Sequence, residues 1–529
     1  MSKQNIQHLA SSLVETFNRF KERPGIDVNN RCYTWGETAK LSGSVAKALE
    51  GTDGDYVSLF GYRSIEAYSG IFGIILAGKA YTPLNPRFPT ERNRMMLTAS
   101  GAKQMVLAPE CVENFRSFAG SVDELRVICH GDRAQFDGLD SEFPKHQFLF
   151  TEPVQDKVFS RIPPNPAPDS KKPVYLLFTS GSTGAPKGVS VNGTNLKFYL
   201  NYTLERYQIN EFDKLSQMFD LTFDLSVHDI FLAAMSGACL CVVPERFVMG
   251  PAKFIREKEL TLWFSVPSVV MFMNKFRMLK PDNFQSLRFS LFCGEALPAK
   301  SAELWQKAAP NSIVENLYGP TEATIAFTNY RWNSENSPNE CINGVVPIGS
   351  AFNGLKTTIL KENGSKAAID EPGELLLGGD QVTDGYYQNR ELTKEKYITH
   401  LDDGRWYRTG DLVKQDFNGC LYFLGRIDDQ IQIRGYRVEL QEIDQVLREA
   451  SGTELAVAIP VFDENGNVES IAGCIQLTES DELKSKIVAY CSKSLTKYMV
   501  PSMIHFIDHI PLNSNGKINR KELVNRINA

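Results

Sequence analysis

The chain has 529 residues, of which 42% are hydrophobic and 23% are charged, and its formal net charge is −6. This length exceeds what one compact core organises, so we expect a globular protein of two or more domains. The acidic balance argues against a general nucleic-acid binder. The N-terminus lacks the apolar core of a signal peptide, no segment approaches the roughly 20 apolar residues of a membrane span, and the ten cysteines form no C-x-x-C pair. We therefore expect a cytoplasmic protein with no nucleic-acid partner, no membrane span, no zinc site and no disulfide framework.

Short apolar runs alternate with helix-like stretches along most of the chain. This alternation predicts an α/β fold of strands joined by helical crossovers. The apolar runs include YVSLFG (56–61), KQMVLA (103–108), DELRVIC (123–129) and SLRFSLFCG (286–294).

Further along the chain the residue pattern changes twice. A proline-rich segment at 161–173 is predicted to be a connection, and from about residue 345 short strands are separated by glycines, as in GELLLGG, GYYQN and GCLYFLGR. After Asp428, helix and strand patterns alternate again. We predict a large N-terminal domain at 1–427 with α/β layers and a β-rich part, and a small, mobile α+β domain at 428–529.

The stretch LLFTSGSTGAPKGV (176–189) runs from an apolar strand pattern into a loop of Thr, Ser and Gly with one lysine, Lys187. Glycines allow close approach of the backbone to a ligand, and hydroxyl, amide and ammonium groups can bind phosphate. Lys187 does not follow a glycine as in a P-loop, and the glycines do not match the Rossmann spacing. A Ser/Gly surface turn is the alternative interpretation.

Four later segments complete a set. They are NLYGPTEATIAF (316–327), WYRTGDLV (406–413), with Asp411 predicted in a turn, GRIDDQIQIRGYRVEL (425–440) and PLNSNGKINRKEL (511–523). Each alone could be a surface turn or a solvated run of charges. In this order they resemble the adenylate-forming superfamily, which contains acyl- and aryl-CoA ligases, luciferase and amino-acid adenylation domains. The resemblance extends from ILAGKAYTPLNPRFPTER (75–92) to the C-terminal lysine.

The resemblance implies ATP and Mg²⁺ as cofactors. Glu322 matches the family's Mg²⁺ carboxylate, while Lys517 would bridge the substrate carboxylate and the α-phosphate and would be catalytic together with Glu322 and Thr183. The glycine loop would hold the β- and γ-phosphates, which leave as pyrophosphate, through Thr179, Ser180, Gly181, Ser182, Thr183, Gly184 and Lys187. The rest of the nucleotide site would comprise Gly294, Glu295, Ala296, Asn316, Tyr318, Gly319, Thr321, Asp411 and Arg426. Of these, Tyr318 would stack on adenine and Asp411 would bind the ribose hydroxyls.

In this family a thiol attacks the adenylate in a second half-reaction, after the C-terminal domain has rotated. Asp428 matches the hinge, where a few residues absorb the change in backbone conformation. The family motif usually reads Q-V-K-I-R-G, whereas this chain has Gln432 in the position of the lysine. That departure puts any role of Gln432 in thiol transfer in doubt and leaves adenylation untouched.

The segment LTFDLSVHDIF supplies Phe223 and Asp224, which match the residues of amino-acid enzymes that hold the substrate's α-ammonium. A fatty or aryl acid would leave Asp224 without a cationic partner, which costs free energy in a dry pocket. The alternative is that Asp224 is a helix N-cap.

The pocket residues carried over by the resemblance indicate a small amino acid. FDLSVHDIF and LFCGEALP resemble D-alanine–carrier protein ligases, whose cysteine lies against the substrate's α-carbon. Leu317 replaces a threonine and His228 a methionine of those enzymes, and a larger Leu317 favours glycine, as in the glycine–carrier protein ligases of lipid A modification. His228 could instead contact a polar side chain such as that of serine, and both Cys293 and His228 could simply be core residues. The pocket set is Phe223, Asp224, Leu225, His228, Ser265, Leu291, Cys293, Leu317, Ile325, Ala326 and Lys517.

Only twelve residues follow Lys517, and no G-G-x-S attachment site occurs in the chain. We therefore expect the partner to be a separate carrier protein with a phosphopantetheine thiol. The leading hypothesis is an amino acid–carrier protein ligase (AMP-forming), with glycine favoured and D-alanine next. An acyl- or aryl-CoA ligase is the enzymatic alternative, and a nucleotide-binding sensor relic is the non-enzymatic one.

Overall fold

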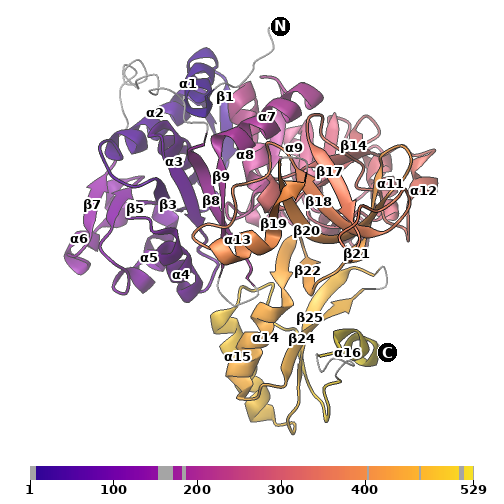
Figure 1. Cartoon of the computed structure of the whole chain (residues 1–529). Coiled ribbons are helices and arrows are strands. Elements are labelled where there is room, and N and C mark those ends of the chain that lie inside the picture. The colour runs from indigo at the N-terminus through magenta and orange to yellow at the C-terminus, as the bar shows by residue number, and fades with distance from the viewer. Residues whose placement is uncertain are drawn as a thin grey trace. The chain divides into compact units, whose positions relative to one another are not determined.

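The structure is a computed structural model that describes residues 8–152, 171–181, 186–401, 404–463, 466–511 and 518–527. It is a mixed α/β protein, and the predicted fold class, a large N-terminal part with a small C-terminal part, is confirmed (Figure 1). The chain divides into two compact units. Unit 1 comprises Met1–Asn85, Leu97–Leu177 and Gly188–Ile427, and unit 2 comprises Pro86–Met96, Phe178–Lys187 and Asp428–Ala529.

A seven-stranded sheet has the order β7-β6-β5-β3-β4-β8-β9. The strands from β7 to β8 run parallel, and the predicted strands at 56–61, 103–108 and 123–129 contain β3, β5 and β6. Both faces of a parallel sheet are covered, which explains why these strands read as continuous apolar runs. The strands are β3 (Tyr56–Phe60), β4 (Ala80–Leu84), β5 (Gln104–Leu107), β6 (Arg126–Cys129), β7 (Gln147–Phe150), β8 (Pro173–Thr179) and β9 (Lys187–Asn192).

A nine-stranded sheet has the order β16-β15-β14-β13-β12-β10-β11-β1-β2. Its strands from β14 to β1 are parallel, and antiparallel strands extend both edges. The predicted strand at 286–294 contains β13. The strands are β1 (Pro24–Val28), β2 (Arg31–Thr34), β10 (Lys214–Gln217), β11 (Cys239–Val242), β12 (Leu262–Ser265), β13 (Phe289–Phe292), β14 (Ile313–Tyr318), β15 (Thr328–Arg331) and β16 (Ser350–Ala351).

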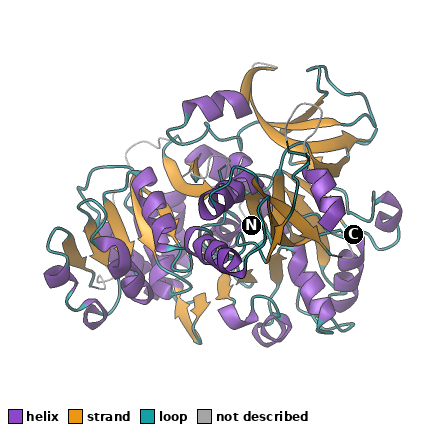
Figure 2. Ribbon diagram, turned by 90° about the horizontal axis from the view of Figure 1, so that it is seen from below, coloured by secondary structure: helices purple, strands orange, loops and turns teal. Residues whose placement is uncertain are grey.

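Helices of unit 1 contact strands of both sheets (Figure 2). Helix α8 (Leu225–Ser236) packs on β10 and β11, whereas α3 (Ile65–Leu76) packs on β3 and β4. Every residue of α8 is buried, as expected for a helix that is largely apolar all round. The other helical elements before Asp428 are α1 (Leu9–Arg19), α2 (Trp35–Ala48), α4 (Thr90–Ser100), η1 (Pro109–Cys111), α5 (Val112–Ala119), η2 (Arg133–Phe136), α6 (Leu139–Glu142), α7 (Gly193–Tyr207), η4 (Glu245–Phe247), α9 (Ala252–Lys258), α10 (Pro267–Lys275), α11 (Ala299–Ala308), η5 (Thr321–Ala323), α12 (Ser337–Glu340) and α13 (Arg390–Lys396).

Strand β14 is held in place by a fully buried carboxylate, Glu315. Arg206 donates to it through Nε and Nη2, at 3.0 and 2.6 Å, and Arg331 Nε donates at 3.1 Å. The Tyr207 hydroxyl donates at 3.0 Å. Several donors thus share the compensation of this one buried charge. This anchoring fixes the strand that carries residues 316–318 of the predicted site.

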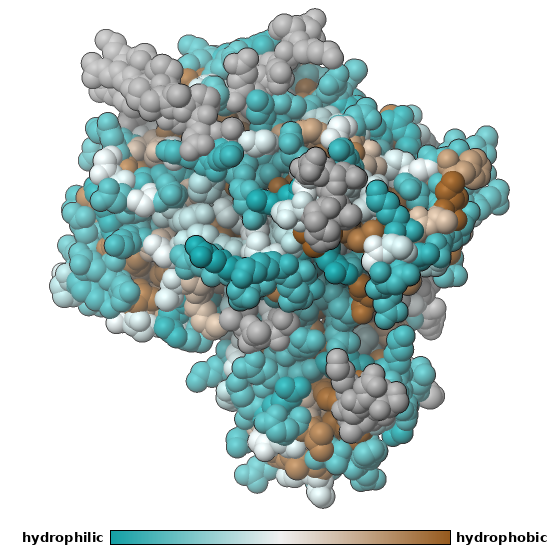
Figure 3. Space-filling model, in the orientation of Figure 1, coloured by the Kyte–Doolittle hydropathy of each residue, from teal (hydrophilic) through white to brown (hydrophobic). Residues whose placement is uncertain are grey.

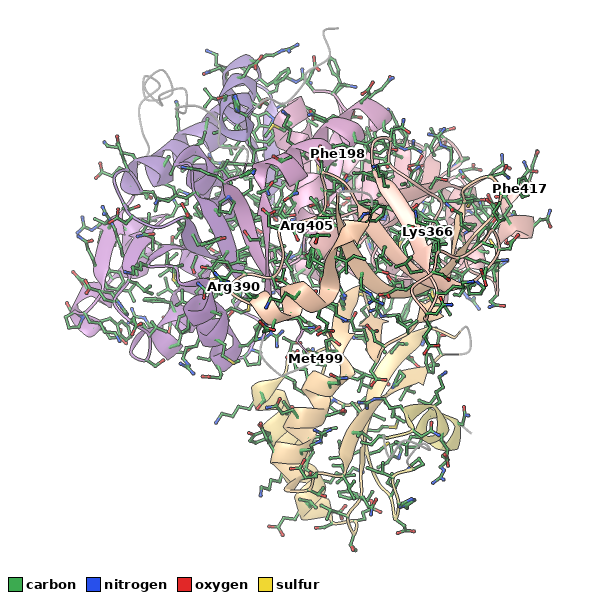
Figure 4. All side chains as sticks on the ribbon, in the orientation of Figure 1. Phe198, Lys366, Arg390, Arg405, Phe417 and Met499 are labelled. Atoms are coloured by element: carbon green, nitrogen blue, oxygen red, sulfur yellow. The ribbon has the colours of Figure 1, made fainter. Side chains whose placement is uncertain are left out.

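The β-rich part of unit 1 is a five-stranded sheet in which β17, β18, β20 and β19 follow one another and β21 pairs with β20. The segment GYYQN (385–389) is not a strand, contrary to our prediction: Gly385 has φ 133°, and Tyr386 makes only an isolated bridge to Val189. Phe417, in the turn between β20 and β21, points away from the ribbon and is 79% exposed (Figure 4). The strands are β17 (Lys356–Leu360), β18 (Gly373–Gly378), β19 (Tyr397–Leu401), β20 (Gly404–Gln415) and β21 (Leu421–Arg426).

Unit 2 contains a three-stranded sheet with a core on each face. Ala456 and Ala458 of β24 belong to the cluster formed with α14 and α15, whereas Val457 and Ile459 pack with Leu523 of α16. This follows the two-residue period of a strand. The elements after Ile427 are β22 (Gln430–Ile433), β23 (Tyr436–Glu439), α14 (Leu440–Ser451), β24 (Ala456–Phe462), β25 (Val468–Ile475), α15 (Asp481–Ser494), β26 (Met503–Phe506) and α16 (Arg520–Ile527).

None of the helices in the described ranges combines the length and the apolar character that crossing a membrane requires. In Figure 3 the hydrophobic residues form small separate patches on a largely hydrophilic face. The proline-rich segment at 161–173 lies almost entirely outside the described residues.

Candidate active site

The carboxyl ends of three neighbouring parallel strands bring many of the predicted residues together. Ser265 ends β12, Cys293 directly follows β13, and Leu317 lies near the end of β14. Ligands of α/β proteins commonly bind outside the carboxyl ends of parallel strands. The nine-stranded sheet therefore gathers the predicted pocket at one edge. Gly294, Glu295 and Ala296 continue from Cys293, and Asn316, Tyr318, Gly319, Thr321, Ile325 and Ala326 surround or follow the end of β14.

Asp224 precedes α8 and occupies its N-cap position, as the alternative interpretation expected, but its side chain makes no capping hydrogen bond. Its carboxylate is buried, and Oδ2 has no hydrogen-bond partner among the residues that the structure describes. A buried, unpartnered carboxylate oxygen is costly unless a ligand supplies a donor. Such a carboxylate is suited to bind a cationic group of a ligand.

Burial raises the pKa of Asp224 to about 7. The Thr321 side chain lowers this pKa by hydrogen bonding, the Glu322 charge raises it, and the backbone N–H of Ile325 lowers it. No cationic side chain is among the main influences on Asp224 within the described part of the chain. The Asp224 charge in turn contributes to raising the pKa of Tyr81 and Tyr175, two buried residues that the sequence analysis missed because they lie on distant strands.

Cys293 and His228 are both buried, and Cys293 lies within reach of the Asp224 charge. Burial raises the pKa of the Cys293 thiol to about 12, and the Asp224 charge adds to the effect, so the thiol stays neutral. The hydroxyl of Tyr199 lies 2.6 Å from His228 Nδ1, and the His228 ring lies 4.4 Å from that of Phe264. Burial lowers the pKa of His228 to about 3. His228 is thus a neutral, packed histidine with one nitrogen already hydrogen-bonded.

The remaining pocket residues are also buried or nearly so. Ser265 Oγ accepts a hydrogen bond from Trp263 Nε1 at 2.9 Å. Leu317, Leu291 and Ala326 are buried, Phe223 is half-buried, and Leu225 begins the buried helix α8. Ser265 and these apolar side chains are uncharged. Among the predicted substrate-binding residues that the structure describes, Asp224 is therefore the one with a carboxylate.

Glu322 lies in η5, one turn after β14, and is buried. Tyr386 donates to Glu322 Oε1 at 2.7 Å, and the backbone N–H of Thr383 donates to the Glu322 carbonyl at 2.9 Å. Within the described ranges no cluster of three His, Cys, Asp or Glu side chains could hold a metal ion. A single carboxylate fits Mg²⁺, which is commonly bound by one or two carboxylates together with water and substrate phosphates.

Tyr318, Asp411 and Arg426 form a connected cluster. The Tyr318 hydroxyl donates to Asp411 Oδ2 at 2.5 Å, and Arg426 Nη1 donates to Oδ1 at 2.5 Å. Asp411 was expected in a turn, but it lies within β20, paired with Arg426 of β21. The physical reason is an irregularity of β20, where Gly410 adopts φ 72° and its N–H is accepted by Glu374 Oε1 at 3.1 Å.

Other predicted nucleotide residues have local structural bonds. Asn316 Nδ2 donates to the Pro347 carbonyl at 2.9 Å, and its Oδ1 is buried with no partner in the described part of the chain. Glu295 Oε2 accepts from the backbone N–H of Ser268 at 2.8 Å. At Gly319 a Cβ atom would meet the Ala326 backbone at 2.7 Å, so only glycine fits there.

The described part of the glycine loop belongs to unit 2 and binds carboxylates there. Lys187 Nζ lies 2.7 Å from Glu439 Oε1, and Gly181 N–H donates to Glu442 Oε2 at 3.2 Å. Ser180 Oγ donates to the Arg437 carbonyl at 2.8 Å. The Thr179 hydroxyl donates to the Lys187 carbonyl at 3.5 Å across the loop. Lys187 and the Gly181 N–H, which were predicted to bind phosphate oxygens, thus bind carboxylate oxygens of the protein itself.

Four of the predicted site residues lie outside the described residues: Ser182, Thr183, Gly184 and Lys517. Asp428 is the first residue of the C-terminal segment of unit 2. Gln432 lies on β22, opposite Arg437 of β23.

Comparison with known proteins agrees with this arrangement. The chain belongs to the family of AMP-binding enzymes, matched over residues 13–387, and the C-terminal domain of that family matches residues 442–517. It is 30% identical over 506 residues to a D-alanine–D-alanyl carrier protein ligase of Staphylococcus aureus (strain Newman), covering 94% of each chain.

Solved structures are also similar to this chain. The structure of the Vibrio cholerae adenylation domain AlmE in complex with glycyl-adenosine-5′-phosphate has a TM-score of 0.90 and 31% identity, covering 100% of this chain and 98% of that one. IdnL7 follows with a TM-score of 0.72 and 29% identity, covering 98% and 99%. The predicted membership in the adenylate-forming superfamily is confirmed, and the chain is an enzyme of that family.

The pKa of Asp224 leads to a pH prediction. Only the ionised carboxylate can pair with an ammonium group, so kcat/KM for the amino acid should fall as pH decreases below about 7, approaching tenfold per pH unit. The raised pKa of Tyr81, Tyr175 and Cys293 and the lowered pKa of His228 keep these neighbours neutral between pH 5.5 and 8. The measurement is amino-acid-dependent ATP–pyrophosphate exchange across this range. A flat profile would contradict the assignment of Asp224.

Proposed function

We propose that this enzyme activates a small amino acid with ATP, forming an aminoacyl-adenylate and pyrophosphate, and then passes the aminoacyl group to the phosphopantetheine thiol of a separate carrier protein. The observation that carries the proposal is the buried Asp224 carboxylate, whose Oδ2 has no partner in the described residues. A fatty or aryl acid offers it no donor, whereas the α-ammonium of an amino acid supplies a charge-assisted one. This disfavours an acyl- or aryl-CoA ligase.

The roles of the remaining residues follow the family pattern and stay proposals. Glu322 would hold Mg²⁺, which neutralises phosphate charge when bound. Asp411, oriented by Tyr318 and Arg426, would accept hydrogen bonds from the ribose hydroxyls. Tyr318 would present its ring to adenine, and Lys517 would stabilise negative charge between the substrate carboxylate and the α-phosphate. The glycine loop with Thr183 and Lys187 would grip the departing pyrophosphate.

We propose glycine as the preferred substrate, with D-alanine next. Leu317 is buried on β14, where a leucine fills more of the pocket than the threonine of D-alanine enzymes. The Vibrio cholerae relative was solved with a glycyl adenylate, and the Staphylococcus aureus relative is a D-alanine enzyme. His228 supports a size role more than a polar one, because the Tyr199 hydroxyl already engages its Nδ1.

A substrate panel tests this function. In ATP–pyrophosphate exchange, glycine should give the highest kcat/KM among glycine, both alanines, serine, proline and β-alanine, because the pocket offers one carboxylate and little further space. Fatty and aryl acids are the matched amine-free controls and should give no exchange above background. Exchange with such acids, and none with any amino acid, would overturn the proposal. Loading of a phosphopantetheinylated carrier protein with labelled glycine then tests the second half-reaction.

The wall formed by Leu317 gives a second prediction. Leu317→Thr should admit alanine while glycine remains a substrate, because forcing a methyl group into a filled pocket costs about 1–3 kcal/mol. The ratio of kcat/KM for glycine to that for each alanine should fall by about 10- to 200-fold. His228→Met serves as the comparison within the same pocket. An unchanged ratio in Leu317→Thr would refute the steric explanation of specificity.

A further inference from the structure

The loop that follows β14 is gripped by a single buried glutamine from the β-rich sheet. Gln381 lies just after β18 and is fully buried. Its Nε2 lies 3.1 Å from the carbonyl oxygens of Ala323 and of Thr324, and 2.7 Å from that of Ala326. The Thr324 hydroxyl donates back to the Gln381 carbonyl at 2.7 Å. The two N–H groups of one amide are therefore shared among three of the four carbonyls of residues 323–326.

This loop has an unfavourable backbone conformation. Thr324 has φ 60° and Ile325 has φ 70°, and both residues are β-branched. Branched side chains are genuine outliers in the left-handed region. Each such residue costs on the order of 1–3 kcal/mol and persists only where the surroundings over-determine it. The hydrogen bonds from Gln381 hold these two residues in the unfavourable conformation.

Gln381 is itself held in place. Asn195 Nδ2, on α7, donates to the carbonyls of Asp380 and Val382 at 2.7 and 3.2 Å. The Asn195 backbone N–H is accepted by Asn192 Oδ1 at 3.0 Å, which completes the capping of α7. The residues on both sides of Gln381 are thus fixed to a helix end. A continuous series of hydrogen bonds therefore connects α7 to residues 380–382, and these residues to the loop at 323–326.

Glu322, the residue directly before the loop, has supports of its own. Glu322 is held by the Tyr386 hydroxyl and the Thr383 N–H, neither of which belongs to Gln381. Gln381 holds the part that contains Ile325, whose backbone N–H faces the Asp224 carboxylate. Loss of the Gln381 amide would therefore release residues 323–326, while Glu322 itself would keep its bonds to Tyr386 and Thr383.

We propose that Gln381 is a positioning residue for the amino-acid pocket: it holds the strained residues Thr324 and Ile325 so that the loop keeps its place beside Asp224. The inference rests on the proposed function and adds a determinant outside the family motifs quoted above. The loop carbonyls engage Gln381 Nε2, whereas Oε1 is buried with no partner in the described part of the chain. The effect of Gln381 is on substrate binding through loop geometry.

Gln381→Met tests this role, because methionine is close in size and cannot donate a hydrogen bond. KM for glycine should rise by at least about tenfold, since displacements of about 1 Å near a reacting group can cost up to about a hundredfold in rate. KM for ATP should change less than about threefold, because Glu322 keeps its own supports. Both constants come from ATP–pyrophosphate exchange, and thermal unfolding is measured in parallel.

Gln306→Met is the matched control. Gln306 Nε2 also donates to two backbone carbonyls, those of Ala309 and Ser312, at 3.1 and 2.9 Å, outside the loop at 323–326. This variant should lower the unfolding temperature without moving KM for glycine. If Gln306→Met raises KM for glycine as much as Gln381→Met, the effect is one of general stability and the proposal is wrong.

A rescue experiment separates positioning from stability. Glycine adopts positive φ without strain, so Thr324→Gly added to Gln381→Met should bring KM for glycine back toward the wild-type value. An additive loss in the double variant would overturn the proposal. If Gln381→Met does not fold, Thr324→Val replaces it, since it removes only the reciprocal hydrogen bond and should raise KM for glycine by a smaller factor. An unchanged KM in a folded variant also overturns it.

Failure of the proposed function has a different signature. If the wild type shows no amino-acid-dependent exchange, the function is wrong and no variant bears on Gln381. If the wild type exchanges with glycine and Gln381→Met retains the wild-type KM for glycine, the function stands and the positioning role is refuted.

Discussion

The Asp224 carboxylate is the constraint on which the rest of the site depends. The fold places it at the start of a wholly buried helix, leaves Oδ2 without a partner in the described residues, and sets the like charge of Glu322 close enough to raise its pKa further. Burial of this kind raises its pKa to about 7, which means that the free enzyme holds the charged form at a cost. In the proposed function, a substrate ammonium would remove that cost. The ion pair between Asp224 and the substrate ammonium would then account both for substrate binding and for the rejection of acids without an amine.

Rigid elements keep this costly group in position. Glu315, paired with Arg206 and Arg331, fixes the strand from which Leu317 and Tyr318 extend. Gln381 fixes the strained loop after that strand. In unit 2, Lys187 and the Gly181 N–H already bind carboxylate oxygens, so their affinity for anions is used within the chain. The phosphates of a nucleotide would have to replace these carboxylates to use the same groups.

The sequence predicted the fold class and the family well, because apolar strand runs and ordered motifs are local signals. The runs at 56–61, 103–108, 123–129 and 286–294 each contain a strand. Local reading failed for Asp411, since only the pairing partner shows that it belongs to a strand with an irregularity. It could not find Gln381, because a contact between residues 381 and 326 depends on tertiary structure. The roles of the site residues, including Lys517 outside the described ranges, stay predictions.

The most direct test of Asp224 as the ammonium partner compares glycine with acetate, its amine-free counterpart, in the wild type and in Asp224→Ala. The measured quantity is the ratio of the two kcat/KM values in ATP–pyrophosphate exchange. The wild type should favour glycine by about 10⁴-fold or more, because a site built for a polar group strongly rejects the analogue that lacks it. In Asp224→Ala that ratio should collapse toward one. A ratio that stays at its wild-type value in Asp224→Ala would contradict the account.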